Sequence, residues 1–411
     1  MDNAVTGAAV VTGLGVVAPN GLGVEDYWSA TLRGDNGIGR ITRFDPSGYP
    51  VRLAGEIPGF EPKDHLPGRL IPQTDHMTRL ALTSAAWALD DAAVDPAAID
   101  EYGMGVVTAS ASGGFEFGQR ELQKLWSKGP EYVSAYQSFA WFYAVNTGQI
   151  SIRHGMRGPS GVLVNEQAGG LDAVAHARRV IRKGTQLVVS GGVDASLCPW
   201  GWVAQIARGE CSTVDDPDRA YLPFDEDASG YVPGEGGAIL VVEDEDAAAQ
   251  RGASQNYGEI AGYGATFDPK PGSGRDPGLA RALRLALADA QVAAEDVDVV
   301  FADAAGLPQA DQAEGAAITA VFGQRATPVP VTAPKTMTGR LYSGSGPVDL
   351  AAAFLSMRDG VIPPTINVDR PAPRCPVDLV REPRQVPVRT AMVVARGNGG
   401  FNSAMVLRAP G

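Results

Sequence analysis

The sequence contains an internal repeat, and a repeat restricts the fold more strongly than any single motif. The run A-L-D-D-A-A-V-D-P-A-A-I-D at Ala88–Asp100 is similar to A-L-A-D-A-Q-V-A-A-E-D-V-D at Ala286–Asp298. Each copy follows an apolar pattern with helical spacing. Each leads into a strand-like run that ends in small residues, at Gly103–Ser112 and at Val297–Gly306. The chain is therefore predicted to contain two related halves, and coincidence in an alanine-rich sequence is the alternative.

Short apolar runs rich in β-branched residues support this organisation. The further strand candidates are Ala8–Val11, Leu187–Gly191, Ala238–Val242, Glu259–Tyr263, Ala391–Ala395 and Ser403–Leu407. They alternate with helical patterns, which is typical of sheets covered by helices on both faces. We therefore predict an α/β protein with an N-terminal half at 1–255 and a C-terminal half at 256–411, joined near the polar stretch 244–256.

Composition limits the functions that the chain can have. Its 411 residues are 44% hydrophobic and 20% charged, and the net charge of −13 argues against general nucleic-acid binding. No apolar run is as long as a membrane span, and Met1–Gly13 lacks the basic and apolar regions of a secretion signal. The three cysteines and four histidines give no disulfide or metal-ligand spacing. We therefore expect a cytoplasmic protein that binds no nucleic acid, membrane or metal.

A predicted strand-to-helix elbow surrounds Gln167. Residues Val162–Val174 read V-L-V-N-E-Q-A-G-G-L-D-A-V, which is an apolar run, a turn of small residues and the start of a helix. Acyl-transfer enzymes present a nucleophile on such an elbow, because the helix N-terminus lowers a thiol pKa and offers N–H groups to an oxyanion. A glutamine amide is not a usable nucleophile near neutral pH. The sequence thus predicts the geometry of a catalytic site without its nucleophile.

Several motifs give the chain a family resemblance. They are V-T-G-L-G-V-V-A-P-N-G at Val11–Gly21, Y-L-P-F-D-E-D-A-S-G-Y-V-P-G-E-G-G-A at Tyr221–Ala238, P-K-T-M-T-G-R at Pro334–Arg340 and G-G-F-N-S-A at Gly399–Ala404. With these motifs the chain resembles, from end to end, the condensing enzymes of the thiolase superfamily. The N-E-Q-A-G-G-L-D-A block and the segment Ser138–Pro159 most resemble the chain length factor, or ketosynthase-beta subunit, of bacterial type II aromatic polyketide synthases. The resemblance implies a thiolase-like duplicated fold, a layered αβαβα sandwich with two mixed sheets.

The resemblance also locates the catalytic positions, which in active family members hold a cysteine and two histidines. Gln167 stands at the cysteine, Asp303 and Arg340 stand at the histidines, and Lys335 is retained with an expected structural role. An aspartate places negative charge beside an enolate, and an arginine stays protonated and cannot shuttle protons. No catalytic group is then intact. Gln167 is either a packed, hydrogen-bonded core amide or a mimic of a thioester carbonyl, and an ion pair is one interpretation of Asp303 and Arg340.

Residues 113–126 show helical periodicity, and in the chain length factor family this helix lines the far end of the polyketide tunnel. The implied gate residues are Phe115, Gly118, Leu122, Trp200 and Gly201. Octaketide relatives tend to carry larger residues where Gly118 and Leu122 stand. A helical turn rises about 5.4 Å and a two-carbon unit adds roughly 2.5 Å, so an opened gate predicts a product longer than an octaketide, with a decaketide favoured. The alternative is that Gly118 only allows close packing and Leu122 is ordinary core.

The resemblance implies a non-catalytic subunit that pairs with a ketosynthase-alpha subunit and sets the length of a poly-β-ketone. The acyl carrier protein would carry the 4′-phosphopantetheine, so we expect no cofactor in this chain. The aromatic segment Tyr136–Tyr143 is too apolar for an exposed loop and is predicted to be interface or core. The basic cluster Arg178, Arg179, Arg182 and Lys183 is predicted to be a solvated helix end or a carrier-protein contact.

Two other functions remain open. One is a malonyl-acyl-carrier-protein decarboxylase that makes the acetyl primer through Gln167, although relatives with this glutamine tend to keep both histidines. The other is a purely structural partner subunit without a role in length control. Gate variants distinguish the second from a chain length factor.

Overall fold

The computed structural model describes residues 7–270 and 272–411. Residues 1–6, which open both the segment Met1–Gly13 and the predicted N-terminal half, lie outside the described residues. Its centre is a mixed sheet in which each half contributes five successive strands. In the N-terminal half these are β1 (Ala9–Ala18), β8 (Gly236–Asp244), β7 (Leu187–Asp194), β5 (Met104–Ala109) and β6 (Ser160–Leu163). In the C-terminal half they are β9 (Gly258–Phe267), β16 (Phe401–Arg408), β15 (Thr390–Gly397), β10 (Val299–Phe301) and β11 (Pro330–Thr332). All the strand candidates in the sequence are therefore confirmed.

The two series of strands have the same topology. In each, the first three strands are antiparallel and the last two pairings are parallel. Hydrogen-bonded pairs join β1 to β9, between Val10 and Glu259 and between Val11 and Gly258. The described strands therefore form one continuous 12-stranded sheet with β2 (Gly21–Leu22) and β13 (Asp378–Leu379), and not two separated sheets.

The repeat in the sequence corresponds to a repeated helix–strand contact. The first copy begins in α3 (His76–Asp91), and the second begins in α10 (Leu279–Ala290). A Cβ at Gly13 of β1 would lie 2.1 Å from the carbonyl oxygen of Ala88, the first residue of its copy. A Cβ at Gly262 of β9 would lie 2.3 Å from that of Ala286, the first residue of the other copy. Glycine in the strand lets each helix approach its sheet closely, so the duplication is present in packing as well as in topology.

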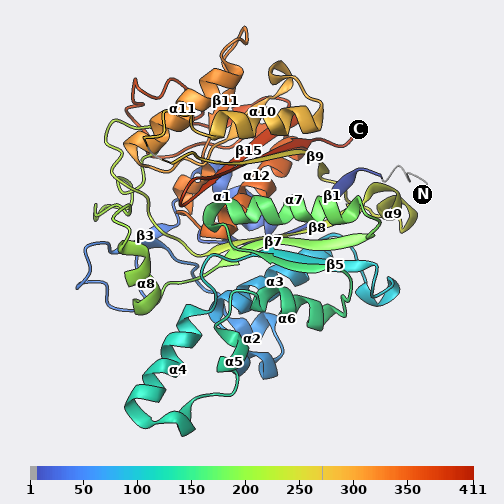
Figure 1. The fold of residues 1–411 in the computed structure, drawn as a ribbon, viewed down its shortest axis with the longest axis vertical. Helices are drawn as coiled ribbons and strands as arrows, with labels where there is room; N and C mark the ends of the chain where they lie inside the picture. Colours follow the sequence, from blue (N-terminus) through green and yellow to red (C-terminus); the bar gives the residue numbers. More distant parts are fainter. Residues whose placement is uncertain (1–6, 271) are drawn as a thin grey trace.

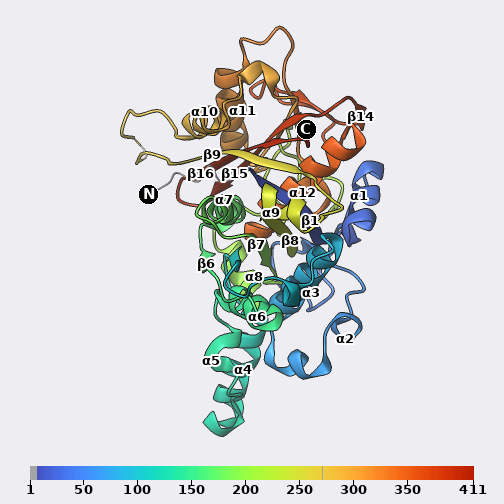
Figure 2. The same ribbon diagram turned by 90° about the vertical axis from the view of Figure 1, so that its right-hand side faces the viewer.

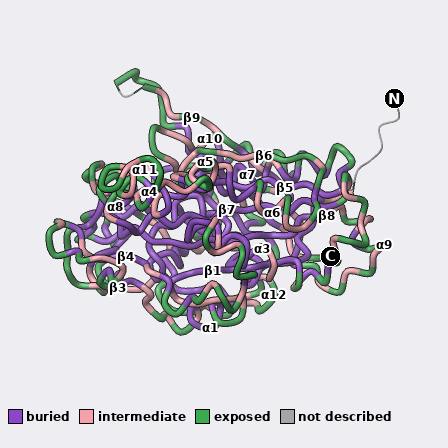
Figure 3. Tube along the Cα trace, turned by 90° about the horizontal axis from the view of Figure 1, so that it is seen from below, coloured by how far each residue is buried: buried purple, intermediate pink, exposed green. Residues whose placement is uncertain are grey.

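The helices and the two series of strands are stacked in the αβαβα order (Figure 1). Helices α10 and α11 (Pro308–Phe322) cover the outer face of the C-terminal strands, and α3 and α6 (Val145–His154) cover that of the N-terminal strands. Helices α7 (Gly169–Ile181) and α12 (Ser345–Asp359) lie between the two and are almost wholly buried (Figure 3). The shorter elements are α1 (Val24–Arg33), α2 (Pro62–His65), α9 (Glu245–Gln250), β3 (Ile38–Arg40), β4 (Leu53–Gly55), β12 (Val361–Ile362) and β14 (Arg384–Gln385).

One part of the chain projects from this body. Helix α4 (Phe115–Lys128) and the short helix α5 (Gln137–Ala140) extend away from the layers, and α8 (Pro199–Ile206) lies against the base of α4 (Figure 2). Within residues 7–270 and 272–411, no helix combines the length and the apolar character needed to cross a membrane.

Candidate functional site: a substituted catalytic centre and an apolar gate

Gln167 lies on the predicted elbow. Strand β6 passes into α7 through a 3₁₀ turn, η4 (Glu166–Ala168), and Glu166 has a φ of 50°, in the left-handed region that non-glycine residues seldom adopt. The Gln167 side chain is 1% exposed, and neither of its amide atoms has a hydrogen-bond partner among the described residues. The interpretation of Gln167 as a hydrogen-bonded core amide is therefore right about burial and wrong about hydrogen bonding. The turn thus holds the side chain in the interior, with its amide unpaired among the described residues.

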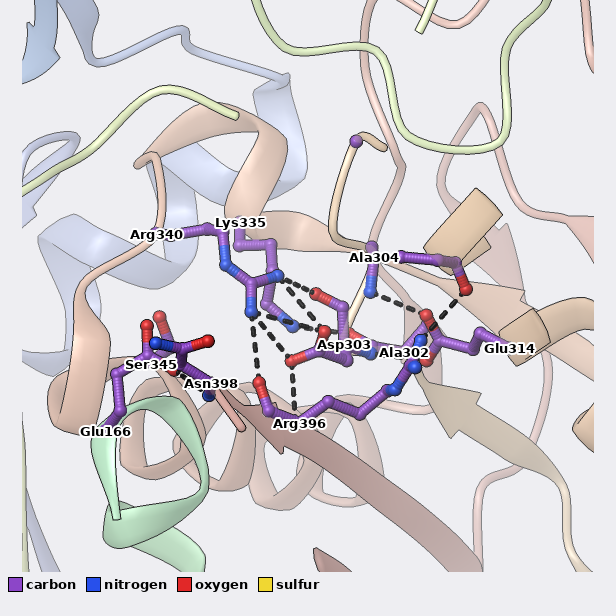
Figure 4. A network of polar contacts seen from close by, with 12 residues as sticks. Glu166, Ala302, Asp303, Ala304, Glu314, Lys335, Arg340, Ser345, Arg396 and Asn398 are labelled. Atoms are coloured by element: carbon purple, nitrogen blue, oxygen red, sulfur yellow. Dashed lines mark hydrogen bonds and ion pairs between the residues drawn. The ribbon is translucent and has the colours of Figure 1, made fainter. Parts of the chain in front are cut away.

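Asp303 and Arg340 form the ion pair that was one interpretation of their sequence positions (Figure 4). The guanidinium donates to both carboxylate oxygens at 3.1 Å, and it also lies 5.5 Å from the centre of the Tyr231 ring. Both side chains are buried. Burial opposes the charged form of Asp303, yet Arg340, with Lys335 and Arg396, holds the pKa of that carboxyl below its usual value. The pair is thus fully ionised, and neither partner is free to exchange a proton near neutral pH.

Lys335 has the structural role that we expected from its position. Its ammonium lies 2.7 Å from the carboxylate of Asp349, and both side chains are 3% exposed. It also donates to the carbonyl oxygen of Ala302, the residue before Asp303 (Figure 4). Burial raises the pKa of Asp349 to about 6, and Lys335 opposes this rise. Lys335 therefore fixes α12 to the end of β10.

Two further carboxylates, which the sequence reasoning missed, hold the loop that carries Asp303. Glu314 accepts hydrogen bonds from the backbone N–H groups of Asp303 and Ala304, at 2.7 and 2.9 Å. Asp311 accepts from Gly306 and Phe224, both at 3.0 Å. Burial raises the pKa of Asp311 to about 7, and it raises the pKa of Glu314 as well. One sequence signal could have identified these two carboxylates. They stand at i and i+3 in D-Q-A-E, after a predicted strand, and this spacing places them on one face of a helix.

A cavity of about 200 Å³ lies outside the substituted centre, with Asp303 and Arg340 in its lining. Charged groups that pair with one another surround it. Arg208 lies 2.6 Å from Glu166 and 2.7 Å from Glu210, and the backbone N–H of Asn398 donates to Glu166 at 2.5 Å. The four positions Gln167, Asp303, Lys335 and Arg340 thus supply no nucleophile and no group that shuttles protons near neutral pH.

The structure brings the predicted gate residues together. The rings of Phe115 and Trp200 stack with centroids 4.8 Å apart and an interplanar angle of 19°. A Cβ at Gly118 would lie 3.1 Å from the Trp200 ring, and one at Gly201 would lie 3.0 Å from the Phe115 ring. Leu122 and Trp200 line an open apolar groove of about 480 Å³ with Trp126. The glycines leave the space that these rings occupy, so a larger residue at either position displaces the aromatic pair.

Two family models match the chain in succession. The family "Beta-ketoacyl synthase, N-terminal domain" matches residues 8–248, and "Beta-ketoacyl synthase, C-terminal domain" matches residues 257–369. The chain is 65% identical to the actinorhodin polyketide beta-ketoacyl synthase 2 of Streptomyces coelicolor, over 98% of both chains. It is 64% identical to the tetracenomycin polyketide synthase ketoacyl synthase beta subunit of Streptomyces glaucescens, also over 98% of both.

The chain belongs to the ketosynthase-beta, or chain length factor, branch of the beta-ketoacyl synthase family. Among solved structures, it is similar to the ishigamide ketosynthase/chain length factor, with a TM-score of 0.89 and 29% identity, over 99% of this chain and 100% of that one. It is also similar to a chain of the AntDE:AntF complex, a type II polyketide synthase acyl carrier protein with its ketosynthase bound to the hexaketide. That match has a TM-score of 0.87 and 27% identity, over 99% of this chain and 100% of that chain.

The gate helix of this ketosynthase-beta chain turns its apolar face outward. The residues of α4 that pack inward are Phe117, Gly118 and Glu121, whereas Leu122 is 36% exposed and Trp126 is 82% exposed. The alternative that Leu122 is ordinary core is therefore wrong. Periodicity identifies the apolar face of a helix, but it does not tell whether the same chain covers that face.

The predicted interface segment lies beside this face. Trp141, Phe142 and Tyr143 are all exposed, and their rings form a continuous series, with centroids 6.0 and 4.2 Å apart. A Cβ at Gly118 would lie 3.5 Å from that of Trp141, so the segment packs against α4 where the helix faces the body of the chain. Of the two expectations for Tyr136–Tyr143, the exposed apolar surface fits an interface and not the core of this chain.

The basic cluster of the ketosynthase-beta chain is smaller than its sequence indicates. Arg178 is buried, pairs with Asp289 at 2.5 Å and donates to the carbonyl oxygen of Ala261. It therefore connects α7 to α10 and the start of β9, and it is not available to a carrier protein. The other basic residues of the cluster, Arg179, Arg182 and Lys183, are exposed at the end of α7.

Proposed function

We propose that this chain is the non-catalytic chain length factor of a type II aromatic polyketide synthase. The observation that carries the proposal is the contrast between its two sites. The substituted centre holds a buried amide and a closed ion pair, Asp303 with Arg340, whereas the gate at Phe115 and Trp200 is formed and opens on an apolar groove. A chain without intact catalytic groups that keeps a formed apolar gate fits a subunit that limits the length of a bound product.

The proposed partner is a ketosynthase-alpha subunit, which supplies the catalytic groups in a heterodimer. The exposed aromatic surface of α4 and Tyr136–Tyr143 supports this, because contiguous apolar surface marks interaction sites. The names of the similar structures support it too, since one is a ketosynthase/chain length factor and another is a ketosynthase with its acyl carrier protein. The carrier protein would bring the growing poly-β-ketone on its 4′-phosphopantetheine, and the complex would act in the cytoplasm without a cofactor held by this chain.

The proposed product is longer than an octaketide, with a decaketide favoured. Gly118 leaves the Trp200 ring in direct contact with the helix, and the exposed Leu122 side chain borders the groove. Both positions hold smaller residues than the resemblance associates with octaketides. A gate opened by about one helical turn, roughly 5.4 Å, would admit about two more two-carbon units.

The test is to narrow the gate in the assembled synthase. Leu122→Phe and Gly118→Thr, each co-expressed with a ketosynthase-alpha subunit and an acyl carrier protein, should shorten the released polyketide by about one to two units while total synthesis is retained. Mass spectrometry of the released products gives their length. Leu285→Phe is the matched control, because Leu285 is an exposed leucine on α10, far from the gate. Unchanged length in Leu122→Phe at normal yield would favour the purely structural partner.

One observation favours a second activity at the substituted centre, the decarboxylation of malonyl-acyl-carrier-protein to the acetyl primer. Both amide atoms of buried Gln167 lack partners among the described residues, and an unpaired buried amide is costly unless something hydrogen-bonds to it. A thioester carbonyl would accept from it. Acetyl-carrier-protein formation should then fall at least about tenfold in the Gln167→Ala complex. An unchanged rate of formation would exclude this activity.

A further inference from the structure

The two helices that form the gate have no strong cap of their own at the N-terminus. The first N–H groups of a helix have no partner within it, and a side chain at the preceding residue usually accepts from one of them. Helix α4 follows Gly114, which has no side chain to do so. Helix α8 follows Cys198, whose sulfur accepts from Gly201 at 3.4 Å, and a thiol is a weak acceptor. Helix α4 therefore lacks a side-chain cap of its own, and α8 has only the weak one from Cys198.

Asp75 supplies the missing acceptor to α4. One of its carboxylate oxygens accepts from the backbone N–H of Met77, as the cap of its own helix α3, at 2.8 Å. The other accepts from the backbone N–H of Phe117, in the first turn of α4, at 2.7 Å. The Asp75 side chain is fully buried, and α3 packs on β1 and β8 in the core of the protein. One carboxylate thus connects the start of the projecting helix to a helix that packs on the central sheet.

Gln119 supplies the missing acceptor to α8. Its side-chain oxygen accepts from the backbone N–H of Trp200 at 2.6 Å. The residue before Trp200 is Pro199, which has no N–H, so the bond from Gln119 is the strong one in the first turn of α8. Trp200 is the residue whose ring stacks on Phe115 and lies against Gly118. Gln119 therefore fixes the backbone of the tunnel end to the gate helix itself.

We propose that Asp75 and Gln119 are positioning residues that set where the tunnel ends. Their hydrogen bonds connect the core helix α3 to α4 and α4 to α8. These two bonds determine how far Trp200 lies from the gate face of α4. The inference rests on the proposed length-setting function, and it adds two specificity-determining residues: Gln119, which lines the groove beside Trp200, and Asp75, which does not line it. A two-carbon unit adds only roughly 2.5 Å to an extended chain, so small displacements of Trp200 decide which length is favoured.

The test uses the full complex with ketosynthase-alpha and the carrier protein. Gln119→Met keeps the length of the side chain and removes the acceptor, whereas Gln119→Glu keeps an oxygen that accepts from Trp200. In Gln119→Met, the ratio of the main product to its neighbours in length should fall by about fivefold to tenfold, while total synthesis is retained. Gln119→Glu should restore the ratio. Gln312→Met is the matched control, because Gln312 is an exposed glutamine on α11 with no recorded side-chain bond among the described residues.

A structural readout accompanies the product ratio. Hydrogen exchange of residues 199–206 in the same complexes should speed up in Gln119→Met and not in Gln119→Glu or Gln312→Met. Asp75→Asn keeps one of the two acceptor oxygens and provides a second variant, on another helix. It should lower the ratio of the main product to its neighbours in length in the same way. Faster exchange in Gln119→Met without any change in product ratio would overturn the inference, as would a shift of the same size in Gln119→Glu.

Leu122→Phe separates this inference from the function on which it rests. If Leu122→Phe shortens the product and Gln119→Met leaves the ratio unchanged, the gate measures length and the caps do not position it. If neither variant changes the products, the length-setting function itself fails, and the inference fails with it.

Discussion

Asp303 and Arg340 face each other across two hydrogen bonds of 3.1 Å in the protein interior, at the two positions where the resemblance places catalytic histidines. Each side chain also makes a hydrogen bond to the backbone. Arg340 donates to the carbonyl oxygen of Asp303 at 2.9 Å, and the Asp303 carboxylate accepts from the backbone N–H of Arg396 at 2.9 Å. The two substitutions are therefore mutually dependent. Either one alone would leave a buried charge without its partner.

Arg340→Met should destabilise the protein strongly. It leaves the Asp303 carboxylate buried and unpaired, and breaking a buried pair in this way costs about 3–5 kcal/mol. The double variant Asp303→Asn with Arg340→Met should recover a large part of that loss, because it removes the charge. Urea unfolding of the heterodimer, with all variants at the same protein concentration, measures the difference. Equal stability of Arg340→Met and the wild type would show that the ion pair does not hold the site together.

Gln167→Cys should not create an autonomous condensing enzyme. The elbow and the start of α7 would present the new thiol, and an acyl group could be transferred to it. Condensation also needs proton transfer and stabilisation of an enolate, which the locked Asp303 and Arg340 cannot provide. The variant, supplied with malonyl-carrier-protein but no ketosynthase-alpha subunit, should release no polyketide above the wild-type background. Polyketide detected by mass spectrometry under these conditions would contradict the proposed loss of function.

Much of this fold could be predicted from the sequence because its signals are local. The repeated run predicted two halves, and both copies begin where a helix carbonyl meets a strand glycine, Ala88 at Gly13 and Ala286 at Gly262. The elbow at Gln167 was predictable for the same reason, since an apolar run and small residues dictate a tight turn. The pairing of β1 with β9 was not, because it involves only two residue pairs between runs far apart in sequence.

The candidate site was less predictable where the answer depended on burial. The cluster at Arg178 looked like a solvated charge run, but a distant carboxylate, Asp289, and a carbonyl oxygen hold Arg178 inside. Glu121 was not singled out from the sequence, but it is buried and accepts from the backbone N–H of Ser134 at 2.7 Å. In both residues a partner from another element decides burial, and helical periodicity carries no information about such partners.

Stability should depend on pH through Asp311. Burial raises the folded-state pKa of Asp311 to about 7, above the unfolded value of 3.8. Between these pKa values the folded state binds more protons than the unfolded state, so this group lowers stability as the pH rises from about 4 to about 7. The stability of the wild type relative to Asp311→Asn should therefore be higher near pH 5 than near pH 8. Urea unfolding at both pH values checks this, and a relative stability that rises with pH would reverse the sign and contradict the prediction.

Removing aromatic rings from the surface beside the gate should weaken pairing with the ketosynthase-alpha subunit. Trp126 and Trp141 remain 82% and 45% exposed in the described chain. Buried tryptophans at the centre of an interface commonly contribute 2 kcal/mol or more, about 30-fold in affinity. Trp141→Ser should therefore raise the Kd for the partner by about that factor, and the wild-type chain expressed alone should aggregate.

Co-purification and size-exclusion chromatography with light scattering measure both effects. Leu285→Ser is the control, because Leu285 is also an exposed apolar residue but lies on α10, at the opposite end of the molecule from α4 (Figure 1). It should leave the Kd unchanged, because an isolated exposed leucine is normal on a protein surface. A stable, soluble monomer of the wild-type chain, or a Trp141→Ser variant that binds its partner as tightly as the wild type, would show that this aromatic surface serves the chain itself and not a partner.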